Sequence, residues 1–168
     1  MIEKFKTLFF VKSSLITLYI ALTLPIPFIS GEDARNLAIF AFLFGFILII
    51  NITNDYVLTC EEKISYKTSF ISNILGKKSW EIFWKDIKLI KTFPTSQGGK
   101  VYYFISFKNE SFLMPQRIEN LKEFVLLVSQ KTNLEVNKIS YISPLWTYKI
   151  LTCLSIFMII GEMVSFYI

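Results

Sequence analysis

Residues 55–143, which begin DYVLTCEEKISYKT and end KISYIS, form the one long polar stretch of this sequence, and apolar runs lie on both sides of it. The stretch holds 13 Lys/Arg and 9 Asp/Glu residues, whereas the whole chain is 53% hydrophobic and has a mean hydropathy of +0.49. Values this high point to a lipid bilayer rather than to a soluble globule. We therefore expect one small polar domain attached to membrane segments.

Short alternating segments inside the polar stretch predict β-strands. In residues 63–68, Lys and Ser alternate with Ile, Tyr and Thr, and in residues 80–84 two tryptophans and an isoleucine share one face. The clearest strand is VYYFISFK (residues 101–108), whose alternate side chains fall on two opposite faces. We expect five to seven such strands.

An amphipathic helix follows the strands. Pro115 ends the last strand, Asn120 can cap a helix, and residues 121–132 carry apolar side chains at helical spacing. The apolar stripe consists of Ile118, Leu121, Phe124, Val125 and Val128. Several short strands closed by one covering helix predict an α+β domain over residues 55–143.

Three apolar stretches predict membrane-spanning helices. Two form an N-terminal hairpin within residues 1–54, at about 8–29 and 34–52, and the third covers residues 144–168. Pro25 and Pro27 are expected to stop or kink the first helix near Leu24. A cleavable signal peptide is the alternative for the first stretch, but the sequence lacks the small-x-small cleavage pattern.

The basic residues predict the orientation. Lys4, Lys6 and Lys12 precede the first span and the basic domain follows the second, whereas the short link between these two spans is acidic. By the positive-inside rule the domain then lies on the cytoplasmic side of a bacterial inner or thylakoid membrane. The net charge of +5 is modest and sits in a largely apolar chain, so we expect contact with membrane lipids and no nucleic-acid partner.

Composition argues against the common catalytic classes. Histidine is absent, which removes the commonest general base and transition-metal ligand. Cys60 and Cys153 have neither a disulfide nor a zinc spacing. We therefore predict no enzyme activity and no catalytic, cofactor-binding or metal-binding residues, with an enzyme of unknown class as an unfavoured alternative.

Lysines supply one candidate binding patch. Its members are Lys77, Lys78, Lys85, Lys88 and Lys91. They could contact anionic lipid headgroups, each contributing about 1 kcal/mol near such a surface. Alternatively, they protect a sheet edge from pairing with other strands.

Other candidates have equally plain structural explanations. The carboxylates Asp55, Glu61, Glu62 and Asp86 could serve acid–base chemistry or hold a metal if they converged, but a solvated face is the commoner reason for such residues. The aromatic residues could stack on a ligand, but half-buried strands use them routinely for core packing. They are Trp80, Trp84, Tyr102, Tyr103 and Phe104.

Glu162 is the one acidic residue inside a predicted span. It could make an intramembrane contact with a polar group on another helix. Its position near the end of the third span also fits a place at the outer interface, where charge is less costly.

The central stretch resembles bacterial pleckstrin-homology-like (PH-like) domains that are tethered to membrane hairpins. The likeness is carried by WKDI (residues 84–87), the strand at residues 101–107, Met114-Pro115 and the helix at residues 121–132. The layout is similar to uncharacterised cyanobacterial membrane proteins and, more distantly, to the photosystem I assembly factor family, which also has two N-terminal spans before such a domain. The third span departs from that family.

The resemblance implies a fold and a role. The fold is a membrane protein of the α+β class, with three transmembrane helices and a PH-like small β-barrel or sandwich capped by one C-terminal helix. The role is a non-catalytic docking or assembly module that binds another membrane protein, in a photosynthetic membrane protein complex. The alternative role is sensing of anionic lipid headgroups through the lysine patch.

Overall fold

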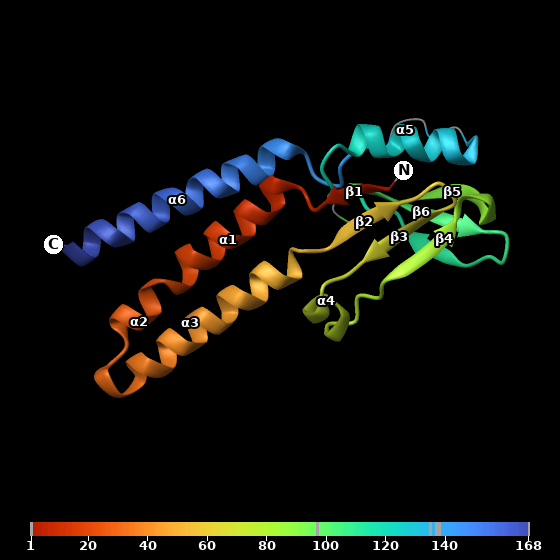
Figure 1. Cartoon of the computed structure of the whole chain (residues 1–168). Helices are drawn as coiled ribbons and strands as arrows, with labels where there is room; N and C mark the ends of the chain where they lie inside the picture. The colour runs from red at the N-terminus through yellow and green to blue at the C-terminus, as the bar shows by residue number, and fades with distance from the viewer. Residues whose placement is uncertain (1, 97, 135, 137–138, 168) are drawn as a thin grey trace. The chain divides into compact units, whose positions relative to one another are not determined.

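A computed structural model of the chain divides into two units, and it describes residues 2–96, 98–134, 136 and 139–167. The first unit, here called the head, comprises Met1–Leu8 and Asn54–Pro144. The second, here called the helical unit, comprises Phe9–Thr53 and Leu145–Ile168. Figure 1 labels the helices and most of the strands of both units.

The helical unit contains three stretches that are long and apolar enough to cross a membrane: Phe9–Ile29, Glu32–Ile52 and Leu145–Phe166. They correspond to α1 (Phe9–Thr23) with the short α2 (Pro25–Ile29), to α3 (Glu32–Ile52) and to α6 (Leu145–Tyr167). The break between α1 and α2 falls at Leu24, as predicted, because Pro25 has no N–H to continue the helix. No residue in the most apolar part of α3 is buried. Such exposure suits a helix surface that faces lipid.

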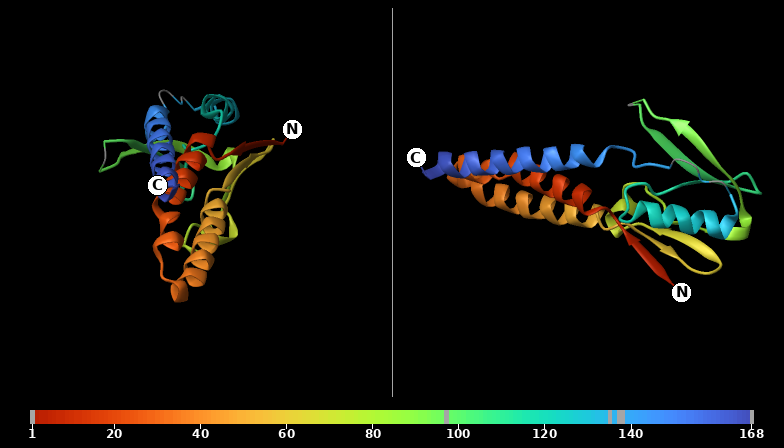
Figure 2. Two further views of the ribbon diagram at one scale, coloured as in Figure 1. Left: turned by 90° about the vertical axis from the view of Figure 1, so that its left-hand side faces the viewer. Right: turned by 90° about the horizontal axis from the view of Figure 1, so that it is seen from above.

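Aromatic contacts join the helices of this unit, and Figure 2 shows that α1, α3 and α6 run alongside one another. The hydroxyl of Tyr19 donates to the carbonyl oxygen of Phe42 at 2.7 Å, and the two rings stack 5.8 Å apart. Gly45 makes this approach feasible, since a Cβ there would meet the Tyr19 ring, 2.9 Å from Cζ. Phe28 stacks on Phe166 at 4.5 Å.

Two antiparallel sheets build the head. The first has the order β1-β2-β3-β4, and the second the order β5-β6-β7. The strands are β1 (Glu3–Lys6), β2 (Tyr56–Thr59), β3 (Lys63–Lys67), β4 (Trp80–Phe83), β5 (Ile87–Pro94), β6 (Lys100–Ser106) and β7 (Ser111–Leu113). Over the described residues the strands form two separate sheets, so the barrel alternative of the sequence prediction is corrected: the described strands do not close into a barrel.

Helix α5 (Leu121–Thr132) covers the core of the head, and its bounds are those predicted from the sequence. Its buried side chains Leu121, Phe124 and Val128 join a cluster that includes Phe104 from β6. Burying each of these side chains stabilises the fold by about 1.5–3 kcal/mol. Asn120 is the N-cap by position, but its side chain makes no cap bond, because its backbone is left-handed at φ 51°.

The head begins earlier in the chain than the predicted boundary at residue 55. Strand β1 precedes α1, and its Phe5 pairs with Val57 of β2 and packs edge-on against Phe124, with ring centroids 5.3 Å apart. Three of the four residues in β1 are charged, so no sequence pattern distinguishes it; pairing with β2 and burial of Phe5 determine it. The hairpin of α1, α2 and α3 is therefore inserted between the first and second strands of the head.

A short helix, α4 (Phe70–Ile74), occupies part of the segment 69–78 that the sequence presents as a loop. Ser69 caps it by accepting a hydrogen bond from the backbone N–H of Ser72 at 3.2 Å. A three-residue 3-10 turn, η1 (Trp84–Asp86), links β4 to β5.

Candidate functional site

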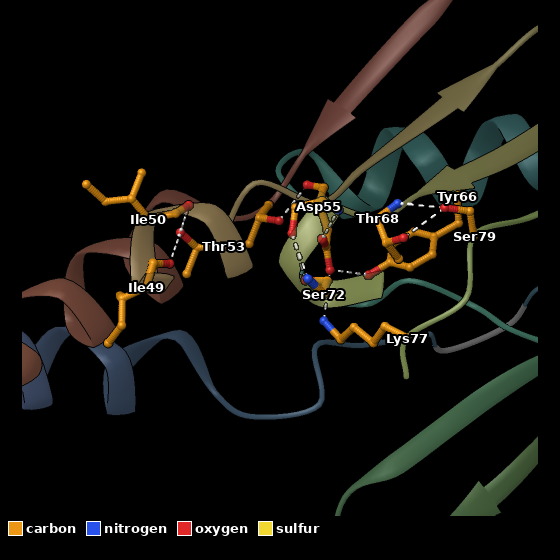
Figure 3. Close-up of polar contacts among 11 residues, drawn as sticks. Ile49, Ile50, Thr53, Asp55, Tyr66, Thr68, Ser72, Lys77 and Ser79 are labelled. Carbon is orange, nitrogen blue, oxygen red and sulfur yellow. Dashed lines mark hydrogen bonds and ion pairs between the residues drawn. The ribbon is translucent and has the colours of Figure 1, made fainter. Parts of the chain in front are cut away.

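The carboxylate of Asp55 organises a polar cluster in the head, shown in Figure 3. Its Oδ1 accepts from the backbone N–H of Ser69 at 2.9 Å. Its Oδ2 accepts from the hydroxyl of Tyr66 at 2.9 Å and from Nζ of Lys77 at 2.8 Å. The Asp55 side chain is only 7% exposed, so these three donors take the place of water.

The donors also determine the protonation of the cluster. Burial raises the pKa of the Asp55 carboxyl, but the hydrogen bonds from Lys77, Ser69 and Tyr66 outweigh burial and hold that pKa below its ordinary value. Burial and the adjacent carboxylate raise the pKa of the Tyr66 hydroxyl, which stays a donor. An ionised Asp55 paired with Lys77 is a stable structural arrangement rather than one poised for proton transfer.

The cluster also ties together segments that enter and leave the helical unit. Thr7, in the segment that leads into α1, donates its hydroxyl to the backbone carbonyl of Asp55 at 2.7 Å. Asp55 itself follows α3, which ends at Ile52, and Thr53 caps that helix through bonds to carbonyls in its last turn. These hydrogen bonds stabilise the chain at the point where the helical hairpin is inserted between β1 and β2.

The five lysines of the predicted patch lie on three segments. Lys77 and Lys78 precede β4, Lys85 lies in η1 after β4, and Lys88 and Lys91 are on β5. Nζ of Lys85 lies 5.7 Å from the ring centroid of Phe83, and that of Lys91 lies 5.1 Å from Phe93. Lys77 is paired with Asp55. Lipid binding by these lysines stays a prediction.

The remaining acidic candidates of the head are not gathered around Asp55. Glu61 and Glu62 are exposed in the turn between β2 and β3, and Asp86 is exposed in η1. Over the described residues no group of three or more Cys, Asp or Glu side chains is placed to hold a metal ion.

The aromatic candidates belong mostly to the core. Trp84, Tyr102 and Phe104 are buried, and the indole N–H of Trp84 donates to the carbonyl oxygen of Cys60 at 2.9 Å. Trp80 is half-buried and stacks on Tyr66 with centroids 6.0 Å apart, whereas Tyr103 meets Phe93 edge-on. Packing accounts for these side chains.

Glu162 lies in α6, and its Oε2 is buried without a hydrogen-bond partner among the described residues. A carboxylate oxygen left in this state inside an apolar helix is costly. The predicted intramembrane polar contact of Glu162 stays a prediction.

An open groove of about 300 Å³ lies beside β1 and the start of α5. It is lined by Glu3, Lys4, Phe5, Lys6, Glu119, Asn120 and Glu123. Strand β1 is an edge strand: it pairs with β2 on one side, and on the other side Lys6 accepts from the backbone N–H of Glu119 at 2.9 Å. Sequence reasoning missed this groove because it depends on a strand that has no periodic signal.

A second groove, of about 160 Å³, lies near the opposite edge of the first sheet. Its lining includes Phe83 from the edge strand β4, Phe107 and Glu110 from the turn after β6, and Phe112 from β7. It is the smaller of these two grooves.

The fold defines an α+β protein with a two-sheet head and three helices long and apolar enough to span a membrane. The chain is similar to the uncharacterized protein slr0269 of Synechocystis, with 26% identity over 147 residues, which covers 84% of this chain and 74% of that protein. No protein-family profile matches the chain. No solved structure matches it.

Proposed function

We propose that this chain is an integral membrane protein that presents a non-catalytic, PH-like docking head. In this proposal α1 with α2, α3 and α6 each cross the bilayer, and the head lies on the cytoplasmic side. The head binds another membrane protein and assists in its assembly. The single observation that carries the docking role is the open groove along the edge of β1.

The order of the strands supports the PH-like assignment. Four consecutive strands form one antiparallel sheet, three more form a second, and one helix follows at the end of the head. A small two-sheet β-domain capped by one C-terminal helix is what the resemblance to PH-like domains implies, and these elements support that proposal. The membrane hairpin then replaces the turn between the first two strands.

The edge of β1 supports recognition of an extended peptide. A strand at the edge of a sheet carries backbone donors and acceptors that a partner strand can pair with. The contact with Glu119 uses the Lys6 end, whereas Glu3, Lys4 and Phe5 border the open groove.

The charged residues on the rim of the groove indicate the kind of partner that fits it. The strand contributes Glu3, Lys4 and Lys6 to the rim, and the segment that leads into α5 and its first turn contribute Glu119 and Glu123. Rim charges of both signs fit a peptide segment that carries both signs, and they determine its register. We therefore propose an extended, mixed-charge segment of a membrane protein as the occupant.

The likeness to a Synechocystis protein supports the place of action. Because that relative is cyanobacterial, a photosynthetic membrane protein complex is the proposed partner. The identity of 26% does not extend the proposal to a particular complex.

Affinity purification of the tagged full chain from its native membranes, in mild detergent, tests this function. We expect a membrane protein to co-purify at a constant ratio. In a variant with Glu123→Arg, which reverses the charge of one wall of the groove, that ratio is expected to fall severalfold.

The matched control is Glu62→Arg, since Glu62 is also exposed but lies outside the groove. It should leave the partner bound. If Glu110→Arg, at the second groove, abolishes binding and Glu123→Arg does not, the β1 groove is not the docking site. A chain that purifies alone from every native preparation contradicts the docking role itself.

A further inference from the structure

The head exposes an unusual apolar surface on the short helix α4. Phe70 is 76% exposed, Ile74 is 69% exposed and Leu75, which ends the helix, is 67% exposed. Phe70 and Ile74 are four residues apart and therefore share one face of the helix. In contrast Ser72, on another face, is buried at 1% exposure and fixes the helix to the head.

The Asp55 cluster holds both ends of this segment. The backbone N–H of Ser69, just before α4, donates to Oδ1 of Asp55, and Lys77, just after it, binds Oδ2. Ser69 and Ser72 are also joined, hydroxyl to hydroxyl, at 2.9 Å. The apolar face of α4 is thus presented on a rigid support and not on a loose loop.

Chain connectivity determines how far α4 can be from the end of α3. Asp55 is the third residue beyond Ile52, where α3 ends, and three residues of extended chain reach about 10 Å. A segment bonded directly to Asp55 is therefore close to the end of an apolar 21-residue helix. If α3 crosses the bilayer, as proposed above, α4 lies at the depth of the lipid headgroups.

The charged side chains that flank α4 have the sign expected at the depth of the lipid headgroups. Lys67 precedes the helix and Lys78 follows it, whereas the charge of Lys77 is paired with Asp55. Cationic side chains beside an exposed apolar face are the features of segments that lie in a membrane interface, where ammonium groups meet phosphates and apolar groups enter the acyl boundary.

We propose that α4 and Leu75 are an interfacial wedge: Phe70, Ile74 and Leu75 insert into the headgroup region of the same leaflet from which α3 emerges, and the neighbouring lysines contact anionic headgroups. The wedge fixes the head against the membrane surface. This inference rests on the membrane-spanning part of the proposed function and is independent of the docking partner.

Spin-label accessibility of the full chain in lipid nanodiscs tests the wedge. In a Cys60→Ser, Cys153→Ser background, single cysteines are introduced at Leu75 and, in separate variants, Ile74. The nitroxide on each is exposed to oxygen, which partitions into lipid, and to a water-soluble nickel chelate. We expect nickel collisions severalfold below those of a label at Phe107, which in the wild type is also 67% exposed but belongs to the turn after β6.

A label at Ile47, inside α3, distinguishes failure of the wedge from failure of the membrane-spanning proposal. If Ile47 is shielded from nickel while Leu75 and Ile74 are as accessible as Phe107, α3 spans the bilayer and the wedge is wrong. If Ile47 itself is accessible, the membrane-spanning proposal fails first. Protection of Leu75 that appears in native membranes but not in lipid-only nanodiscs assigns the surface to a protein partner and overturns the wedge.

Discussion

At the scale of single residues, Asp55 links three segments that are far apart in the sequence. It contacts Thr7, just after β1, and Tyr66, near the end of β3. It also contacts Ser69 and Lys77, on either side of α4. The Asp55 carboxylate matters to all of its side-chain contacts, because the donors that point at its two oxygens are left under-satisfied when one of those oxygens no longer accepts.

We expect Asp55→Asn to lower the stability of the head by about 1–3 kcal/mol, since an amide cannot accept from all three donors at once. The measurement is urea unfolding of the full chain in mild detergent, followed by the fluorescence of Trp80 and Trp84 with Trp146 replaced by Phe. Asp86→Asn is the control, because Asp86 is exposed, and it should change the midpoint little.

The difference between wild type and Asp55→Asn should depend on pH. The lowered pKa of Asp55 means that its contribution is fully present above the ordinary Asp value of about 3.9 and is lost as the pH falls through the lower folded value. The two unfolding curves should therefore be well separated at neutral pH and converge below about pH 4. A separation that is constant down to pH 3 would show that the ionised form of Asp55 is not what stabilises the head.

Asp55 also shows what the sequence can and cannot predict at this scale. The sequence identifies Asp55 only as one of the carboxylates near the start of the polar stretch, and its partners lie 11, 14 and 22 residues away. Only folding of β2, β3 and α4 brings them together, so no spacing rule reveals the cluster.

At the scale of elements, periodic segments were predictable and short ones were not. Helix α5 buries three of its own residues against the core, and the sequence predicts both of its ends. The strong alternation of β6 buries Tyr102, Phe104 and Ser106 on one face. In contrast β1 has four residues and α4 has five, too few for a period to appear. These two elements form through long-range pairing and capping.

Strand β1 leads to a prediction about the head as a fragment. Residues 54–144 alone lack β1 and expose the edge of β2, whereas residues 1–8 joined to 54–144 by a short Gly/Ser linker restore it. The join is feasible because Thr7 and Asp55 are hydrogen-bonded. We expect the joined protein to unfold cooperatively and at a higher urea concentration than the fragment, as measured by circular dichroism.

A Phe5→Ala change in the joined protein serves as its control. Phe5 is 7% exposed, so its truncation should cost about 3–5 kcal/mol, which removes most of the gain from β1. Equal midpoints for the joined protein and the fragment would contradict the assignment of β1 to the head.

At the scale of the whole molecule, a polar head joined to three helices that are long and apolar enough to span a membrane is compatible with a membrane location. The head and the helical unit are connected at three points, after Leu8, after Thr53 and after Pro144. If the helices span the bilayer, all three connections lie on one face and the link between α2 and α3 lies on the other. The acidic residues Glu32 and Asp33 at that link and the basic residues of the head match this orientation.

Site-directed cysteine labelling in intact cells and in permeabilised cells tests this topology most directly. In the cysteine-free background, Gly31→Cys, in the link before α3, should react with a membrane-impermeant maleimide in intact cells, whereas Lys108→Cys, exposed in the head, should react only after permeabilisation. The chain should also stay in the membrane pellet after alkaline carbonate washing. Labelling of both positions from the same side, or release of the chain by carbonate, would contradict a protein that crosses the bilayer three times with its head inside.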